Sequence, residues 1–94
     1  MASVYILYSP SVNQYYIGSC KVLSERIEQH LSKKIPGAFT AKVKDWILYF
    51  SISELKYGQA RLIENHIKKM KSRVYIENLK KYTEVSKKLI TKYQ

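Results

Sequence analysis

Two short, tyrosine-rich apolar runs near the start of the 94-residue chain, residues 4–8 (VYILY) and 15–19 (YYIGS), most constrain its fold. Runs of this length and composition are typical of β-strands. The segment between them, Ser-Pro-Ser-Val-Asn-Gln, is rich in turn-forming residues. The two runs are therefore predicted to pair as an antiparallel hairpin. Because side chains alternate between the faces of a strand, one orientation brings Tyr5 and Tyr16 to the same side.

The rest of the chain combines one further strand pattern with helical patterns. Residues 46–51 (WILYFS) are predicted to form a third strand and, because large apolar residues are so dense there, the central one. Residues 32–43 contain a proline and a glycine and are expected to form a loop. Helical periodicity predicts helices over residues 23–31, 57–72, 74–80 and 83–93. The class is α+β, and residues 1–94 are expected to form a single domain.

The long helix over residues 57–72 carries an apolar stripe at helical spacing. We expect its buried side chains to be Ala60, Ile63, Ile67 and Met70. Glu64 lies beside this stripe.

Basic residues dominate the second half of the chain. The sequence has 17 Lys and Arg against 7 Asp and Glu, a net charge of +10. Residues 1–55 account for +2 of this charge and residues 56–94 for +8. Such a concentration indicates a polyanionic partner, nucleic acid before membrane. The alternative is a basic surface without a specific partner.

Cysteine content and hydropathy limit the possible cellular locations of the protein. The single cysteine, Cys20, excludes an internal disulfide and a cysteine-rich zinc site, which fits a reducing cytoplasm. The sequence shows no signal-peptide pattern, and no apolar run approaches about 18 residues. We therefore expect a cytoplasmic protein that is neither exported nor inserted in a membrane.

Glu64 is the only acidic residue in the middle of the long helix. Mg²⁺ often takes one or two carboxylates from a protein and completes its octahedron with water and phosphate oxygens. Glu64 is therefore a candidate metal ligand. The alternative is a routine ion pair with Lys68, which lies four residues further along the same helix.

Four other residues could take part in phosphate chemistry. Arg26 can bind a phosphate with two hydrogen bonds, and His30 follows it by one helical turn, but both also fit an ordinary polar surface. Tyr5 and Tyr16 are poor bases unless a cation lies nearby, because a free phenol has a pKa of about 10. Their alternative role is aromatic packing. Gly18 fits either a turn or a close approach of the backbone to a ligand.

The order and spacing of these residues resemble those of the GIY-YIG nuclease family, in particular its small stand-alone bacterial members. Ser3-Val4-Tyr5 stands where the family has Gly-Ile-Tyr, and Tyr16-Ile17-Gly18 matches the second half of the motif. Arg26, His30 and Glu64 fall at the positions of the family's helical arginine, its tyrosine or histidine, and its metal-binding glutamate. The resemblance covers residues 4–76. It suggests a core over about residues 3–76, followed by a helical extension over about residues 77–94.

The resemblance implies a fold and a mechanism. The fold is a three-stranded antiparallel sheet flanked by helices, and the reaction is hydrolysis of a phosphodiester with one metal ion. Tyr16 would be the general base, supported by Tyr5. Arg26 would hold the scissile phosphate, Glu64 would bind Mg²⁺ or Mn²⁺, and His30 would assist. The products would carry a 5′-phosphate and a 3′-hydroxyl.

Three positions depart from the family pattern. Ser3 replaces the first glycine of the motif, and Ser19 stands where some repair nucleases of the family have a lysine, although Lys21 is near. Many members have a late asparagine in the site. Asn78 is the candidate for that position, in a sequence context that matches the family poorly.

The sequence thus predicts a metal-dependent DNA endonuclease, with a role in DNA repair or recombination. DNA is favoured over RNA, and the oligomeric state is left open. One alternative is a nucleic-acid-binding module that is inactive or depends on a partner, and another is a structural interaction protein. The predicted nucleic-acid contacts are Gly18, Lys21, Lys68, Lys69, Lys71 and Arg73, with Lys80 and Lys81 continuing the basic surface.

Overall fold

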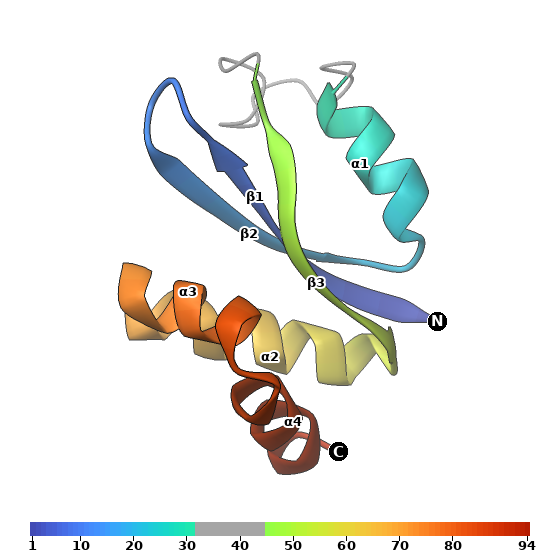
Figure 1. The fold of residues 1–94 in the computed structure, drawn as a ribbon. Coiled ribbons are helices and arrows are strands. Elements are labelled where there is room, and N and C mark those ends of the chain that lie inside the picture. The colour runs from blue at the N-terminus through green and yellow to red at the C-terminus, as the bar shows by residue number, and fades with distance from the viewer. Residues whose placement is uncertain (32–44) are drawn as a thin grey trace.

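The computed structural model describes residues 1–31 and 45–94 and contains one antiparallel sheet. Its strands are β1 (Ala2–Ser9), β2 (Gln14–Cys20) and β3 (Ile47–Leu55), in the order β2-β1-β3 (Figure 1). Strands β1 and β2 form the predicted hairpin, with Tyr5 paired to Gly18 and Leu7 to Tyr16. The α+β class with a three-stranded antiparallel sheet is confirmed.

The prediction that the third strand is central is wrong, because β3 lies at an edge and β1 is central. In a three-stranded sheet, two strands that pair directly as a hairpin leave only an outer position for the third. The apolar density of β3 does not reflect burial, since Ile47 and Leu48 are 54% and 46% exposed. Strand β1 has the continuous burial expected of a central strand, from Ala2 to Leu7.

Helices cover both faces of the sheet. Helix α1 (Leu23–Leu31) lies on one side, and α2 (Tyr57–Met70), α3 (Arg73–Lys81) and α4 (Thr83–Lys92) lie together on the other (Figure 1). The alternation of β1 creates two separate cores. Tyr5 and Leu7 pack with Cys20 and Trp46 against α1, whereas Val4 and Ile6 pack against α2 and its neighbours.

The predicted apolar stripe of α2 is correct except at its last member. Ala60, Ile63 and Ile67 are buried, but Met70 is exposed. Met70 is the last helical residue, and the chain reverses at Lys71, which has the left-handed backbone conformation (φ 47°). The stripe therefore leaves the core where the helix ends. Ser72 then caps α3 by accepting a hydrogen bond of 3.1 Å from the backbone N–H of Tyr75.

The C-terminal helices share the core of α2. Leu79 of α3 and Leu89 of α4 belong to the same buried cluster as Ile63 and Ile67. The division into a core and a helical extension near residue 76 remains a prediction.

Candidate functional site

Tyr5 and Tyr16 lie on the same face of the sheet, as the alternation of the strands predicted. Their ring centroids are 6.3 Å apart. Gly18 makes room for Tyr5: a Cβ atom at Gly18 would lie 2.6 Å from Cζ of the Tyr5 ring and closer still to its hydroxyl oxygen. Gly18 itself is buried and has no unusual φ. The structure therefore requires a glycine because a ring of the protein covers it, and a ligand contact at Gly18 remains a prediction.

The environment of Tyr5 keeps its phenol protonated. The side chain is 0% exposed, and burial raises its pKa far above the ordinary value, helped by the neighbouring Tyr16. A hydrogen bond with the Arg26 side chain opposes this shift. Tyr5 can consequently orient Arg26, while its burial disfavours the charged form that a base requires. Tyr16 is only partly buried and also packs against Trp46, with ring centroids 6.4 Å apart.

Arg26 borders a hollow of about 230 Å³ where β2 ends and α1 begins. We call it the Arg26 hollow, and its lining residues are Cys20, Lys21, Val22, Glu25, Arg26 and Tyr57. Lys21 lies over the Tyr57 ring, with its ammonium nitrogen 5.4 Å from the centroid. Burial raises the pKa of the Cys20 thiol, against the effect of Arg26, so this cysteine is not an activated nucleophile. Two cations outnumber the single carboxylate, Glu25, in this hollow, and the excess positive charge suits an anionic group such as a phosphate.

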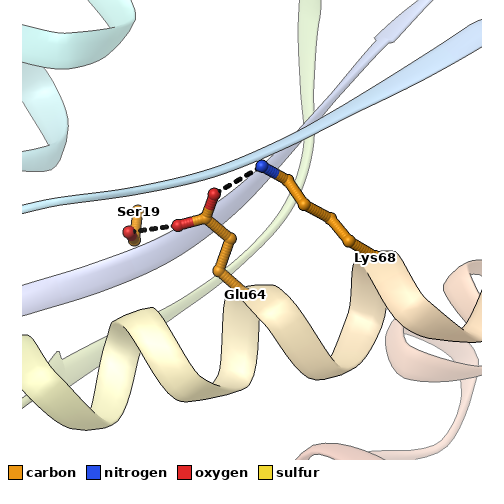
Figure 2. A network of polar contacts seen from close by, with 3 residues as sticks. All are labelled: Ser19, Glu64 and Lys68. Carbon is orange, nitrogen blue, oxygen red and sulfur yellow. Dashed lines mark hydrogen bonds and ion pairs between the residues drawn. The ribbon is translucent and has the colours of Figure 1, made fainter.

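Glu64 lies on the other face of β2 (Figure 2). The Ser19 hydroxyl donates to Oε1 of Glu64, and the Lys68 ammonium donates to Oε2 at 2.6 Å. The Glu64 side chain is 12% exposed and that of Lys68 50%. The ion pair between residues four apart is therefore formed, with Ser19 as an additional partner.

A metal ion at Glu64 could take only one carboxylate ligand from the described part of the protein. Within residues 1–31 and 45–94, no group of three or more His, Cys, Asp or Glu side chains could hold a metal. Oε2 of Glu64 already faces a cation, which shows that positive charge can be placed there. A Mg²⁺ or Mn²⁺ ion at this oxygen would take its other ligands from water and substrate phosphate.

A second hollow, of about 370 Å³, lies between β2 and the junction of α2 with α3. We call it the Lys71 hollow, and its lining residues are Gln14, Tyr15, Ile17, Ile67, Lys68, Lys71, Ser72, Arg73 and Ile76. Arg73 is engaged by the hairpin turn, because it donates at 2.7 Å to both the backbone oxygen and Oδ1 of Asn13. It also lies over the Tyr15 ring, 5.1 Å from the centroid. Lys68 and Lys71 are thus the cations of this hollow without a role in holding the turn.

The predicted site residues fall into two groups on opposite faces of β2. Tyr5, Tyr16 and Arg26 belong to one face, and Glu64 and Lys68 to the other. The two groups meet at consecutive residues of β2. Ser19 donates to Glu64, and the next residue, Cys20, lines the Arg26 hollow.

Several predicted residues stay outside these groups. In the described part of the chain, no hydrogen bond joins Asn78 of α3 to Glu64, so its place in the site remains a prediction. Lys69 is exposed on α2. The backbone of His30 belongs to α1, but its side chain lies outside the described residues.

Ser19 is a departure from the family pattern, and its contact with Glu64 was not predicted from the sequence. The signal was present in the alternation of the second strand, which places Ser19 on the face opposite Tyr16 and Gly18. That face is covered by the helix that carries Glu64.

Comparison with known families identifies the class of protein. The family model of the GIY-YIG catalytic domain matches residues 1–83, and the chain therefore belongs to the GIY-YIG family. Domains of this family are nuclease domains, which implies a nucleic-acid substrate. They generally use divalent metals. Neither curated proteins nor solved structures gave a match to the chain. No helix in the described ranges is long and apolar enough to cross a membrane.

Proposed function

We propose that the protein is a metal-dependent endonuclease that hydrolyses phosphodiester bonds in DNA with one metal ion. The observation that carries this proposal is the position of Arg26 and Glu64 on the two sides of one edge strand. Ser19, which holds Glu64, and Cys20, which lines the Arg26 hollow, are consecutive residues. Consecutive residues of a strand are only about 3.3 Å apart along its axis. A phosphate at the outer edge of β2 could therefore be approached from both sides.

The residues of the α1 face bind the phosphate and move the proton. Arg26 holds the scissile phosphate with its guanidinium and offsets the charge that develops during the reaction. Tyr5 keeps Arg26 oriented. Tyr16, as the general base, takes a proton from the attacking water, whose oxygen forms a bond to phosphorus. The bond from phosphorus to the 3′-oxygen breaks, and the departing oxygen takes a proton from a solvent water, which leaves a 5′-phosphate and a 3′-hydroxyl. His30 follows Arg26 by one helical turn and is proposed to assist at the phosphate.

Glu64 would hold the Mg²⁺ or Mn²⁺ ion, with Ser19 fixing the orientation of its carboxylate. When bound, the ion supplies positive charge that stabilises the phosphate oxygens in the transition state. Asn78 is retained as a candidate for the same side of the site.

The basic residues support a path for the nucleic-acid backbone along β2. The Arg26 hollow includes Tyr57 at the start of α2, and the Lys71 hollow includes Lys68 near its end. Glu64 lies between these positions on the same helix. The strand from Tyr15 to Cys20 spans roughly 17 Å, which is the rise of about five nucleotides of one DNA strand. Lys69, Lys80 and Lys81 would contribute to the basic surface beyond the hollows.

The biological setting is also part of the proposal. The proposed substrate is a structured or damaged DNA, as met in repair or recombination. The free, buried thiol of Cys20 is consistent with a reducing compartment such as the cytoplasm.

Nicking of supercoiled plasmid in Mg²⁺ or Mn²⁺ tests the proposal. Glu64→Ala should reduce nicking at least about 100-fold. Glu64→Gln, which keeps an acceptor for Ser19 but removes the charge, should be nearly as inactive. Glu84→Ala is the matched control, because Glu84 is an exposed acid in the first turn of α4 and should leave nicking unchanged. Circular dichroism checks that each variant is folded. Nicking by Glu64→Ala at the wild-type rate would exclude the assigned role of Glu64.

A nucleic-acid-binding module without nuclease activity is the second candidate. The contacts of Glu64 favour it, because both carboxylate oxygens already have protein partners. This function predicts DNA binding that weakens steeply with salt and no nicking with any divalent metal. The plasmid assay, combined with a binding measurement at two salt concentrations, separates the two functions.

A further inference from the structure

Lys68 occupies a position between the proposed metal ligand and the proposed DNA path. Its ammonium donates to Oε2 of Glu64 at 2.6 Å, and its side chain also lines the Lys71 hollow. The side chain is half exposed, whereas Glu64 is nearly buried. Lys68 is thus the partner that can leave this ion pair more easily, because a lysine has a long, flexible stem and Glu64 also has Ser19 as a partner.

An ammonium group and a metal ion cannot share Oε2 of Glu64 without strong repulsion between two cations. An ion that binds Oε2 of Glu64 must therefore displace Lys68. The displaced ammonium would still lie next to the Lys71 hollow, where a backbone phosphate can replace the carboxylate as its partner. One side chain would then respond to the arrival of the metal and contribute to the binding of DNA.

We propose that Lys68 is a coupling residue: it neutralises Glu64 in the free protein and, once displaced by the metal, holds a DNA phosphate beside Glu64. This inference rests on the proposed function, because it requires Glu64 to be the metal ligand. Toward the metal, Lys68 is a positioning residue that acts through Glu64; toward DNA, it is a direct phosphate contact. Its expected consequence is weak metal binding by the free protein and DNA contacts that strengthen when metal is present.

Metal binding gives the first test, without any measurement of activity. Mn²⁺ is titrated into the free protein, and the unbound ion is followed by electron paramagnetic resonance. Lys68→Met should bind Mn²⁺ about 3- to 10-fold more tightly than wild type, because the competing cation is gone. Lys69→Met is the matched control: it removes the same charge from the next, exposed position and should change the affinity less than about twofold.

DNA binding gives the second test, with a non-cleavable phosphorothioate duplex and with or without Mn²⁺. Lys68→Met should weaken binding by about threefold or more in Mn²⁺ but by much less without metal, because Lys68 then remains on Glu64. Lys69→Met should have the same effect under both conditions. A role of Lys68 that is only structural would likewise give equal effects with and without Mn²⁺.

The outcomes separate the inference from the proposed function. If Glu64→Ala binds Mn²⁺ as tightly as wild type, the metal site itself is wrong. If Glu64→Ala loses Mn²⁺ but Lys68→Met binds it no more tightly than Lys69→Met, the site stands and the coupling role of Lys68 is refuted. Thermal unfolding confirms that the variants are folded, and Lys68→Gln repeats the comparison with a polar replacement.

Discussion

Replacing Gly18 by alanine should destabilise the protein, although it adds only one methyl group. The added carbon would lie 2.6 Å from Cζ and 3.0 Å from Cε1 of the Tyr5 ring, and closest to its hydroxyl oxygen. Real Cβ contacts are longer than this, so either the ring or strand β2 must move. The ring has no free space to enter, because Tyr5 is 0% exposed and packs with Leu7, Cys20 and Trp46.

The size of the effect follows from the cost of overpacking a closed core. Adding a carbon to such a site costs about 1–3 kcal/mol. A loss of about 2 kcal/mol lowers Tm by roughly 8–16 °C in a domain of this size. The same movement shifts the Tyr5 phenol away from Arg26, so we also expect slower plasmid nicking at temperatures where the variant is folded.

Gly58→Ala provides a control with the same chemical change and the opposite expected sign. Gly58 lies in the first turn of α2, and a Cβ atom there would meet nothing within 4 Å. Alanine should stabilise the helix by about 0.5–1 kcal/mol and raise Tm by a few degrees. Adding Tyr5→Phe to Gly18→Ala should recover only part of the loss, because the contact with the ring carbons remains. If Gly18→Ala unfolds within about 2 °C of wild type, the packing argument is wrong.

Three further predictions concern single side chains. Tyr16→Phe should lower plasmid nicking about 100-fold or more and Tyr5→Phe about tenfold or less, because only Tyr16 is assigned as the base; equal losses would contradict these roles. Arg73→Met should lower the free energy of unfolding in urea by about 1–2 kcal/mol, because two hydrogen bonds to Asn13 are lost. Unchanged stability would show that this contact is not maintained in solution. Burial raises the pKa of Tyr15 to about 12. The folded chain therefore holds this proton more tightly than the unfolded chain. The contribution of Tyr15 to stability should be fully present below about pH 10 and should be lost between about pH 10 and pH 12. Circular dichroism should show a smaller alkaline loss in Tyr15→Phe, and an identical loss would refute this assignment.

The local features of the fold could be predicted because they follow from nearby residues. Alternation in the two N-terminal strands placed Tyr5 and Tyr16 on one face, and helical periodicity predicted four helices close to their observed bounds. Spacing also predicted that Glu64 and Lys68 could pair. Each of these inferences uses residues that are close in sequence or joined by a single turn.

Contacts between distant segments were harder to predict. Arg73 belongs to a basic segment and was therefore assigned to nucleic acid, yet it binds Asn13, 60 positions away in the sequence. Asn13 has a left-handed backbone conformation (φ 52°), and both its backbone oxygen and its Oδ1 accept hydrogen bonds from Arg73 of α3. Charge patterning shows where cations are concentrated but does not show which of them the fold itself uses.

The position of β3 also determines the difference between the two tyrosines. Once β1 and β2 form a hairpin, β3 can join either side, and it joins β1. The tyrosine on the central strand, Tyr5, is therefore enclosed, and burial raises its pKa. The tyrosine on the edge strand, Tyr16, keeps part of its surface exposed. If β3 had paired with β2 instead, it would have covered the outer edge of β2, where the face that carries Arg26 meets the face that carries Glu64. The assignment of Tyr16 as base and Tyr5 as its support therefore depends on strand order, which neither motif spacing nor apolar density reveals.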